Sequence, residues 1–435
     1  MGNLQAGAAR TNITPNLGCH MVGYFEDRTA EAIHDDLYAK AIVLSDGEIT
    51  LGLVTCDLID IPVPIIQAAK ARISEQVGIA PECVLISSTH THTAPSAVGA
   101  LATPDEPEYA ESLVPRIADA VATAARSMVP AQAAWASGDC GEEVHNRRWH
   151  MKDGTVKMNP GYQNPNAIRP AGPTDPQLGL LVIRETESYH PIAVYTNLAL
   201  HYVGTGEPNV VSADYFGAFS DALQRMAGSE FVTMMANGCQ GDINNCDFSG
   251  PARRPVHHYS AIERVANVVA AETWKQWNLL REEDFTSDIA LGAGLAEIPF
   301  KRRTATAEEM TAAVELYESS EAWSDSEWLY ARELVLLDET PLEWNIPVQA
   351  LRIGDLGIAG LHGEVFVEVG LDIKARSPMK QTMVVGLASG SIGYVASDEA
   401  LDEGSYETRL CRHVRAPKGT AKLWADTAVG LLETV

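Results

Sequence analysis

Short apolar runs alternate with amphipathic stretches along most of the chain, and this alternation predicts strands and helices in turn. The runs of four to seven residues with flanking turn residues are typical of buried strands. The predicted strands are 39–44, 49–55, 83–86, 180–184, 192–196, 231–237, 349–353, 356–361 and 382–387. The predicted helices are 65–77, 114–128, 213–226 and 257–278. The pattern favours an α/β fold with mixed β-sheets flanked by helices.

One region departs from this alternation. Residues 305–338 are charged and helical in pattern, with Trp323 and Trp328 among them. We expect a helical hairpin over a sheet edge or a lid over a site. Nothing in the composition looks like a linker, so we predict a single domain over 1–435 with a helical insertion at about 305–340.

A polar string follows the apolar run at 83–86 and carries two histidines. It reads Ser-Ser-Thr-His-Thr-His-Thr-Ala-Pro over 87–95. In an extended backbone, residues two apart share a face, so His90 and His92 would point into one space, with the threonines turned away. Two converging imidazoles suit a metal site. The alternative is one packed histidine and one solvent histidine in a polar loop.

Other apolar runs also end in polar groups. The run at 194–200 ends in His201, the run at 358–361 leads to Glu364, and the run at 384–387 leads towards Tyr394. A Gly-rich turn after 231–237 carries Asp242. Several such groups at strand ends are the usual architecture of an active site in an open sheet.

The order of these motifs resembles a known family. They are residues 6–15, the 89–95 segment, Asn146-Arg147, His201, Gly241-Asp242, Gly363-Glu364, Tyr394 and Tyr406-Glu407. The set is similar to the amino-terminal catalytic domain of neutral (alkaline, non-lysosomal) ceramidases, which are zinc-dependent amidases. The resemblance covers nearly the whole chain. The Thr-His-Thr-His segment and the twelve-residue spacing from Tyr394 to Tyr406 are its specific parts.

The resemblance implies a role for each matching residue. Zn²⁺ would be held by His90, His201, Glu364 and Tyr394, two imidazoles, a carboxylate and a phenol that suit this metal. Around the metal, His92 would lie beside it or touch substrate, Arg147 would contact substrate, and Tyr406 would stabilise the oxyanion.

Two departures from the family change the expected chemistry. The Gly-Asp loop has Asn244 where ceramidases have a serine, and the chain ends at Val435 where they continue into an immunoglobulin-like domain. We therefore expect a metal-activated water to hydrolyse an amide, or an ester or lactone, of a substrate other than ceramide. Asp242 or His92 would manage the proton, and Asn244 would help Tyr406 hold the oxyanion.

Three alternatives stay open at this point. The same metal could serve a zinc-dependent lyase or glycoside-cleaving enzyme on this scaffold. The chain could bind a metal and a ligand without turnover. The strand-end residues could also be unrelated, with no metal at all.

The composition and charge of the chain limit the kinds of partner that it can bind. A net charge of -26 argues against nucleic acid and against an anionic membrane surface, and no run of 18 apolar residues is present. The seven scattered cysteines suit reduced thiols. Because the start has neither a basic nor an apolar leader region, we expect a cytoplasmic protein acting on a small molecule. Whether it forms a homo-oligomer is left open.

Overall fold

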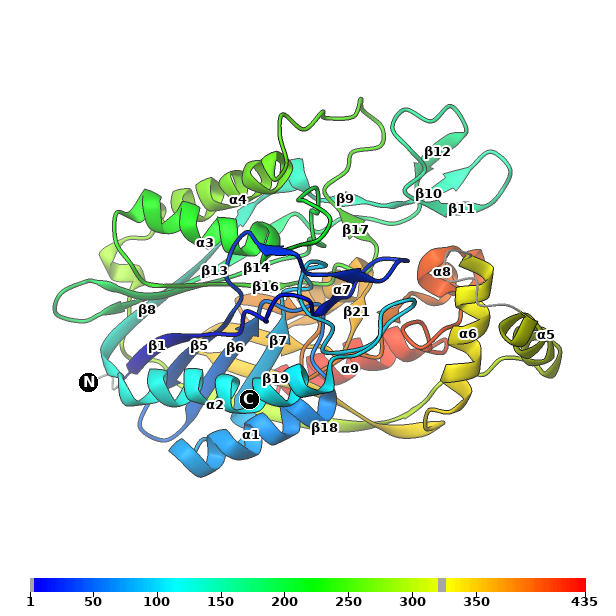
Figure 1. Ribbon diagram of the computed structural model, residues 1–435. Helices are drawn as coiled ribbons and strands as arrows, with labels where there is room; N and C mark the ends of the chain where they lie inside the picture. The colour runs from blue at the N-terminus through cyan, green and yellow to red at the C-terminus, as the bar shows by residue number, and fades with distance from the viewer. Residues whose placement is uncertain (1–3, 320–325) are drawn as a thin grey trace.

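The computed structural model describes residues 4–319 and 326–435, and its largest element is a mixed sheet of eight strands (Figure 1). The order across this sheet is β16-β14-β13-β8-β1-β5-β6-β7. In that order the strands span Val232–Asn237, Pro191–Leu198, Gln177–Glu185, Val129–Asp139, Gln5–Asn12, Tyr38–Ser45, Thr50–Cys56 and Val84–Ser88. Most neighbours are antiparallel, but β6 and β7 are parallel, as are β14 and β16.

Four helices cover the outer face of this sheet. They are α1 (Val63–Val77), α2 (Pro107–Arg126), α3 (Asp214–Ala227) and α4 (Ser260–Leu279). In Figure 1, α1 and α2 lie along the lower side of the sheet and α3 and α4 along the upper side. Alternate residues of each strand face these helices, as the period of two requires. The helices predicted from the pattern at 65–77, 114–128, 213–226 and 257–278 all lie here.

A second sheet packs against the inner face of the first. Its order is β18 (Leu291–Lys301), β19 (Glu343–Ile353), β20 (Leu356–Gly360) and β22 (Gln381–Val385). An apolar core joins residues of both sheets, among them Leu53, Tyr195, Leu351 and Met383. Helices α7 (Val367–Arg376) and α9 (Thr420–Leu432) cover the far face of the second sheet.

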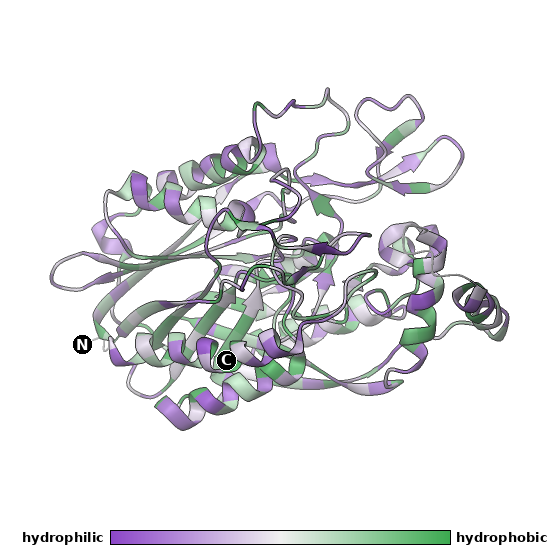
Figure 2. Cartoon of the chain, in the orientation of Figure 1, coloured by the Kyte–Doolittle hydropathy of each residue, from purple (hydrophilic) through white to green (hydrophobic). Residues whose placement is uncertain are grey.

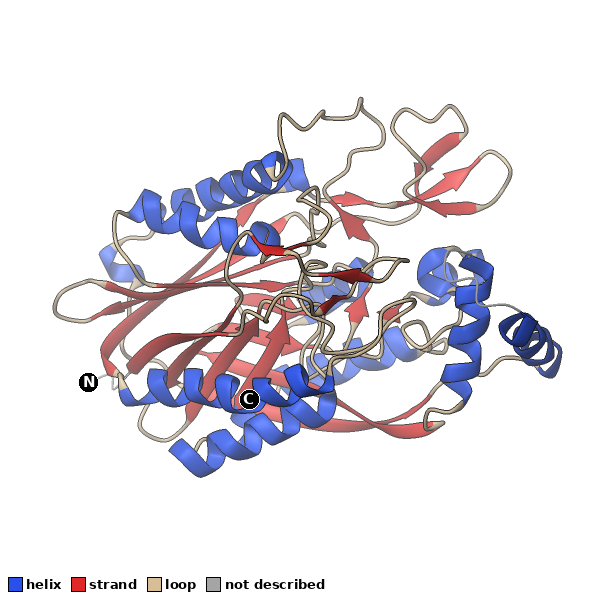
Figure 3. Ribbon diagram, viewed as in Figure 1, coloured by secondary structure: helices blue, strands red, loops and turns tan. Residues whose placement is uncertain are grey.

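The result is four layers in the order helix, sheet, sheet, helix (Figure 3). Figure 2 shows apolar colour concentrated on the strands and polar colour on the outer faces of the helices. The expected class of mixed sheets flanked by helices is confirmed. The sequence pattern did not separate the two sheets, because both have the same short buried runs.

The 305–340 region forms two helices, α5 (Ala307–Ser319) and α6 (Ser326–Asp338). Trp328 of α6 is buried against Ala102, and Arg332 donates a hydrogen bond to the Leu101 carbonyl. Helix α6 therefore packs on the 97–103 loop, on the side of the molecule seen at the right of Figure 1. Trp323 lies outside the described residues.

The first sheet is strongly coiled, and this brings distant strand ends together. Strand β16 at one edge lies against β5, β6 and β7 near the other edge. A twist of roughly 20–25° per strand accumulates across the sheet and turns the ends of β7 and β14 towards the same region. The Asn237 side chain at the end of β16 donates to the Thr89 carbonyl just after β7, at 2.6 Å.

No helix among the described residues has the length and apolar character needed to cross a membrane.

Candidate metal centre

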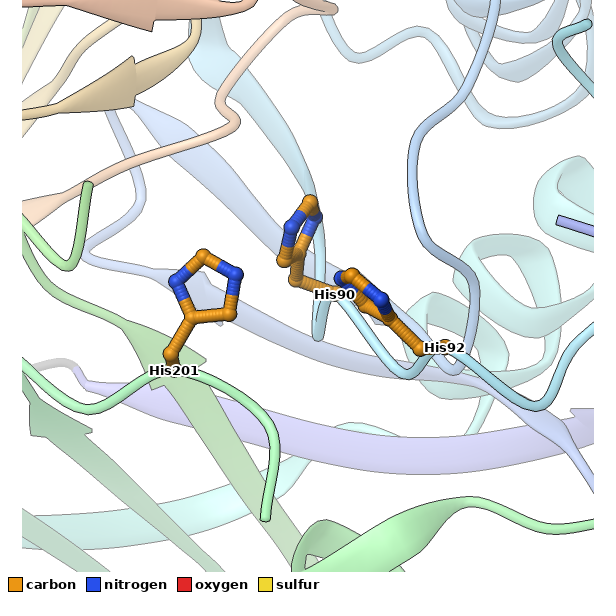
Figure 4. Close-up of side chains that lie close together, drawn as sticks. All are labelled: His90, His92 and His201. Atoms are coloured by element: carbon orange, nitrogen blue, oxygen red, sulfur yellow. The ribbon is translucent and has the colours of Figure 1, made fainter. Parts of the chain in front are cut away.

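Three histidines from two strand ends converge on one buried point (Figure 4). His90 and His92 follow β7, and His201 follows β14. One ring nitrogen from each lies within 4.8 Å of one from each of the others. The ring centroids of His90 and His201 are 4.7 Å apart, and all three side chains are buried. This group can hold a metal ion.

His90 and His92 converge for a different reason from the one predicted. The segment is not extended, since His90 has a left-handed backbone with φ of 67°. Its amide donates to the Leu58 carbonyl, which turns the chain sharply after β7. Thr91 and Thr93 do point away, and both hydroxyls donate to the Ser212 carbonyl. The expected convergence is present, but a tight turn produces it.

Backbone carbonyls set the orientation of all three rings. Nδ1 of His90 lies 2.8 Å from the Ile59 oxygen, Nδ1 of His92 lies 2.7 Å from the Gly23 oxygen, and Nδ1 of His201 lies 3.1 Å from the Gln240 oxygen. A carbonyl only accepts, so each Nδ1 carries the proton and donates it. Nε2 of His92 and Nε2 of His201 are then left with a free lone pair, the arrangement found in metal-binding histidines, whereas Nε2 of His90 faces the Glu364 carboxylate.

Glu364 and Tyr394 reach the same point from the second half of the chain. They face each other as register partners in the parallel pair β21 (Glu364–Val365) and β23 (Tyr394–Val395). Oε2 of Glu364 lies 3.2 Å from Nε2 of His90 and 3.7 Å from Nε2 of His201. Gly241 permits this approach, because a Cβ there would lie 2.5 Å from the Glu364 carbonyl oxygen.

The donor set fits a divalent cation. Among the described residues, Nε2 of His92 and Nε2 of His201 are buried with no hydrogen-bond partner, and Oε2 of Glu364 has only His90 Nε2, 3.2 Å away, and the Tyr394 hydroxyl beside it. Buried polar atoms are rarely left this way, because an unsatisfied group is destabilising. Several acceptors that face one another without a proton between them need a cation. Imidazole and carboxylate ligands suit zinc and similar metals.

The protonation states agree with this arrangement. Burial lowers the pKa of His92 and His201 well below the usual value, and neighbouring positive charge adds to the effect. Burial also acts on His90, but the Glu364 carboxylate outweighs it and raises the His90 pKa. The same contact, with the Tyr394 hydroxyl, holds the pKa of Glu364 below its usual range despite burial.

Arg147 supports the centre from behind. Its Nη2 donates to the Tyr394 hydroxyl at 3.0 Å, and its Nε donates to Glu407 at 2.9 Å. Its Nη1 also lies 3.5 Å from Nδ1 of His201. The guanidinium is buried and paired with Glu407, so its position corresponds to holding the Tyr394 hydroxyl. The direct contact with substrate that the resemblance implied is not the role this geometry favours.

A cavity of about 260 Å³ opens onto the centre. His90, His92, Glu364, Tyr394 and Tyr406 all line it. Tyr406 belongs to the short helix η4 (Tyr406–Thr408), and its ring lies 5.7 Å from that of Tyr394. Tyr406 therefore shares the cavity with the proposed metal-binding groups, and its oxyanion role stays a prediction.

Two predicted catalytic residues lie outside the cavity lining. The Asp242 carboxylate accepts from the Asn146 amide at 2.6 Å and from the Val367 N–H at 2.9 Å, at the start of α7. Asn244 donates to Asn159 and pairs with His145 across a two-stranded ladder. Both side chains are used for structure. Their expected roles in proton transfer and in the oxyanion hole stay predictions.

Sequence reasoning overlooked three residues that shape the site, namely Glu407, His413 and Arg415. Glu407 is fully buried and accepts from both Arg147 and Arg148. Asp60, His413 and Arg415 line the cavity. Glu407 was visible only as the neighbour of Tyr406, and His413 and Arg415 belong to the basic stretch 412–415. Neither the position next to Tyr406 nor the basic stretch indicates a functional site until the fold is known.

The fold is similar to solved structures of ceramidases. Neutral ceramidase from Pseudomonas aeruginosa matches 100% of this chain and 75% of its own, with a TM-score of 0.74 and 17% identity. A ceramidase complexed with C2 matches 99% of this chain and 75% of its own, with a TM-score of 0.75 and 16% identity. Comparisons of the sequence with protein families and with curated proteins find no match. The neutral-ceramidase-like fold expected from the sequence is confirmed.

Proposed function

We propose that this chain is a zinc-dependent hydrolase that cleaves an amide, or an ester or lactone, in a small substrate. The observation that carries the proposal is the set of buried, unpartnered acceptors around one point. Nε2 of His92 and Nε2 of His201 lie there without a hydrogen-bond partner among the described residues, and the Glu364 carboxylate lies 3.2 Å from His90 and 3.7 Å from His201. A neutral-ceramidase-like fold supports the same reading.

The metal would be held by His90, His201, Glu364 and Tyr394. Zinc in such a set polarises a carbonyl and makes water acidic enough to ionise near neutral pH. Arg147 keeps the Tyr394 oxygen in place through its 3.0 Å hydrogen bond. Asn244 lies outside the cavity and is no nucleophile, so the attacking group we propose is water.

The remaining cavity residues supply the proton and charge chemistry. His92 donates from Nδ1 to Gly23, so its Nε2 accepts a hydrogen bond from water inside the cavity. Gly23 is essential here, because a Cβ would lie 2.6 Å from the His92 ring. The Tyr406 hydroxyl donates a hydrogen bond to the substrate carbonyl oxygen, which becomes negative as water adds. The products are a carboxylic acid and an amine or alcohol.

The test begins with metal content. We expect one zinc per chain in the purified protein, and its loss when His90 and His201 are both replaced by Ala. His257→Ala, an exposed histidine away from the centre, is the control. Hydrolysis of short amides, esters and lactones should stop with chelator and return with zinc. Zinc that survives the double replacement would overturn the proposal, and so would activity that ignores the chelator.

Tyr406→Phe tests the oxyanion role separately. The change keeps the ring and removes one hydroxyl, so zinc content should be unchanged. We expect kcat to fall by about 10²–10³, the usual effect of removing one oxyanion donor. A fully active Tyr406→Phe enzyme on its own substrate would exclude this role.

A further inference from the structure

One wall of the cavity holds polar groups that the reaction chemistry leaves unused. Asp60, His413 and Arg415 line the cavity together with the residues of the metal centre. Asp60 follows Ile59, whose carbonyl orients His90. The His413 carbonyl accepts from the Tyr394 amide at 2.9 Å. The wall is therefore joined through backbone to two residues of the centre.

Arg415 stands apart from the other buried arginines nearby. Arg147 is paired with Glu407, and Arg412 is paired with the fully buried Glu333. Within the described parts of the chain, no hydrogen bond and no ion pair engages the Arg415 guanidinium, and its Nε is buried without a partner. Burial lowers the Arg415 pKa to about 10, so the group stays positive at neutral pH. The Arg415 side chain is partly buried, and Asp60 is the nearby opposite charge that acts on it without a direct ion pair. A cation in this setting is stabilised by an anion that reaches it directly.

His413 and Asp60 complete the wall. Both ring nitrogens of His413 are buried and have no partner among the described residues. A histidine ring in its neutral form offers one N–H donor and one acceptor to a ligand. Asp60 accepts from the Ile61 amide, which leaves its other oxygen for a ligand.

We propose that this wall is a subsite for a carboxylate that the substrate carries beside the bond to be cleaved. The planar guanidinium of Arg415 matches a carboxylate with two parallel hydrogen bonds, and His413 adds a third donor. Asp60 accepts from an N–H next to that carboxylate. N-acyl amino acids have this arrangement, with a carboxylate one carbon from the amide nitrogen. The inference rests on the proposed function and names its substrate class.

Arg415 also borders a second cavity, which supplies a control. That cavity has a volume of about 590 Å³, and Lys70 and Trp344 line it without lining the metal cavity. The Trp344 ring lies 5.0 Å from the Arg415 guanidinium carbon. If the carboxylate bound there instead, Lys70 would be its second cation. Replacing Lys70 thus distinguishes carboxylate binding in the second cavity from carboxylate binding in the metal cavity.

Binding to the metal-free protein gives the first readout, because nothing is hydrolysed there. We would titrate N-acetylalanine and N-acetylalaninamide by calorimetry. The acid should bind roughly 10–100-fold more tightly than the amide, as expected for hydrogen bonds to a charged group. Arg415→Met and His413→Gln should each reduce that preference, and Lys70→Met should keep it. If Arg415→Met fails to fold, Arg415→Lys replaces it in the test. Arg415→Lys keeps the charge but loses the planar pair of donors, so it should also reduce the preference for the acid.

Hydrolysis by the zinc-loaded enzyme is read separately, as kcat/KM for the same pair. Arg415→Met should lower the preference for the acid over the amide, and Lys70→Met, outside the metal cavity, should keep that preference. Equal binding of acid and amide to the wild type would overturn the inference, and so would a preference that Lys70→Met abolishes. If the acid binds selectively but neither compound is hydrolysed with zinc, the subsite stands and the proposed function fails.

Discussion

At the scale of single residues, the metal centre depends on backbone carbonyls as much as on side chains. Ile59, Gly23 and Gln240 each accept from one imidazole Nδ1, and so determine which nitrogen faces the centre. None of these three residues has a side chain that suggests a role in metal binding. They contribute through their backbone carbonyls, which accept from the imidazoles. Backbone carbonyls commonly orient metal-binding histidines in this way.

The protonation of His90 makes metal affinity depend on pH. Because its pKa is raised in the metal-free protein, His90 holds a proton that an incoming ion must displace. His92 and His201 have lowered pKa values and release nothing. Zinc affinity should therefore be constant above the raised pKa of His90 and fall by about tenfold per pH unit below it.

Competition with a coloured chelator at a series of pH values measures this slope. His90→Ala should bind more weakly throughout and lose the slope. An affinity that stays flat in the wild type as pH falls would show that His90 carries no displaceable proton.

At the scale of elements, short pairings between distant segments assemble the site. Strands β21 and β23 are two residues each, yet their pairing sets Glu364 opposite Tyr394. Helix η4 brings Glu407 to Arg147 and Arg148, which lie about 260 positions earlier in the chain. These contacts are buried, so water does not weaken them.

Glu407→Gln should destabilise the fold substantially. The change keeps the shape but removes the charge that two buried guanidinium groups share. Breaking a buried pair in this way typically lowers the free energy of unfolding by about 3–5 kcal/mol. Urea unfolding of the metal-free protein measures the effect without a contribution from zinc.

Glu403→Gln is the matched control for this prediction. Glu403 also contacts Arg148, at 3.4 Å, but its side chain is 30% exposed. We expect a loss of less than about 1 kcal/mol, as for surface pairs. Equal losses for the two variants would mean that burial of Glu407 is not what matters.

At the scale of the whole molecule, four layers enclose a small reaction cavity. The two sheets share a dry core, and the coiling of the first sheet gathers ends from both of its edges. The cavity of about 260 Å³ and the net charge of -26 both bear on the substrate. A small volume favours a compact molecule, and the charge disfavours anionic surfaces.

We therefore predict poor turnover of long-chain ceramide and no attachment to bilayers. In cosedimentation, the protein should stay in the supernatant with both neutral and anionic phospholipid vesicles. Zinc-loaded enzyme should hydrolyse a short N-acyl amide faster than ceramide presented in vesicles. Efficient cleavage of vesicle ceramide would contradict this prediction.

Local patterns in the sequence were enough for the elements. The hairpin of β5 and β6 follows from alternating apolar runs around an Asp-Gly turn, and α1 ends at Gly78, which has a φ of 74°. The histidine string after β7 marked a strand end with metal chemistry, and motif order indicated the fold. These signals survive in the sequence because each depends on residues close together in the chain.

The tertiary structure alone decided how the distant groups meet. It divided the strands between two sheets, turned the chain at His90, and moved Asp242 and Asn244 into structural contacts. It also brought Arg415 to the cavity, where no hydrogen bond or ion pair within the described residues engages its guanidinium. The physical reason is that coiling, register and burial arise from packing between segments far apart, and no local pattern encodes which polar group will find a partner.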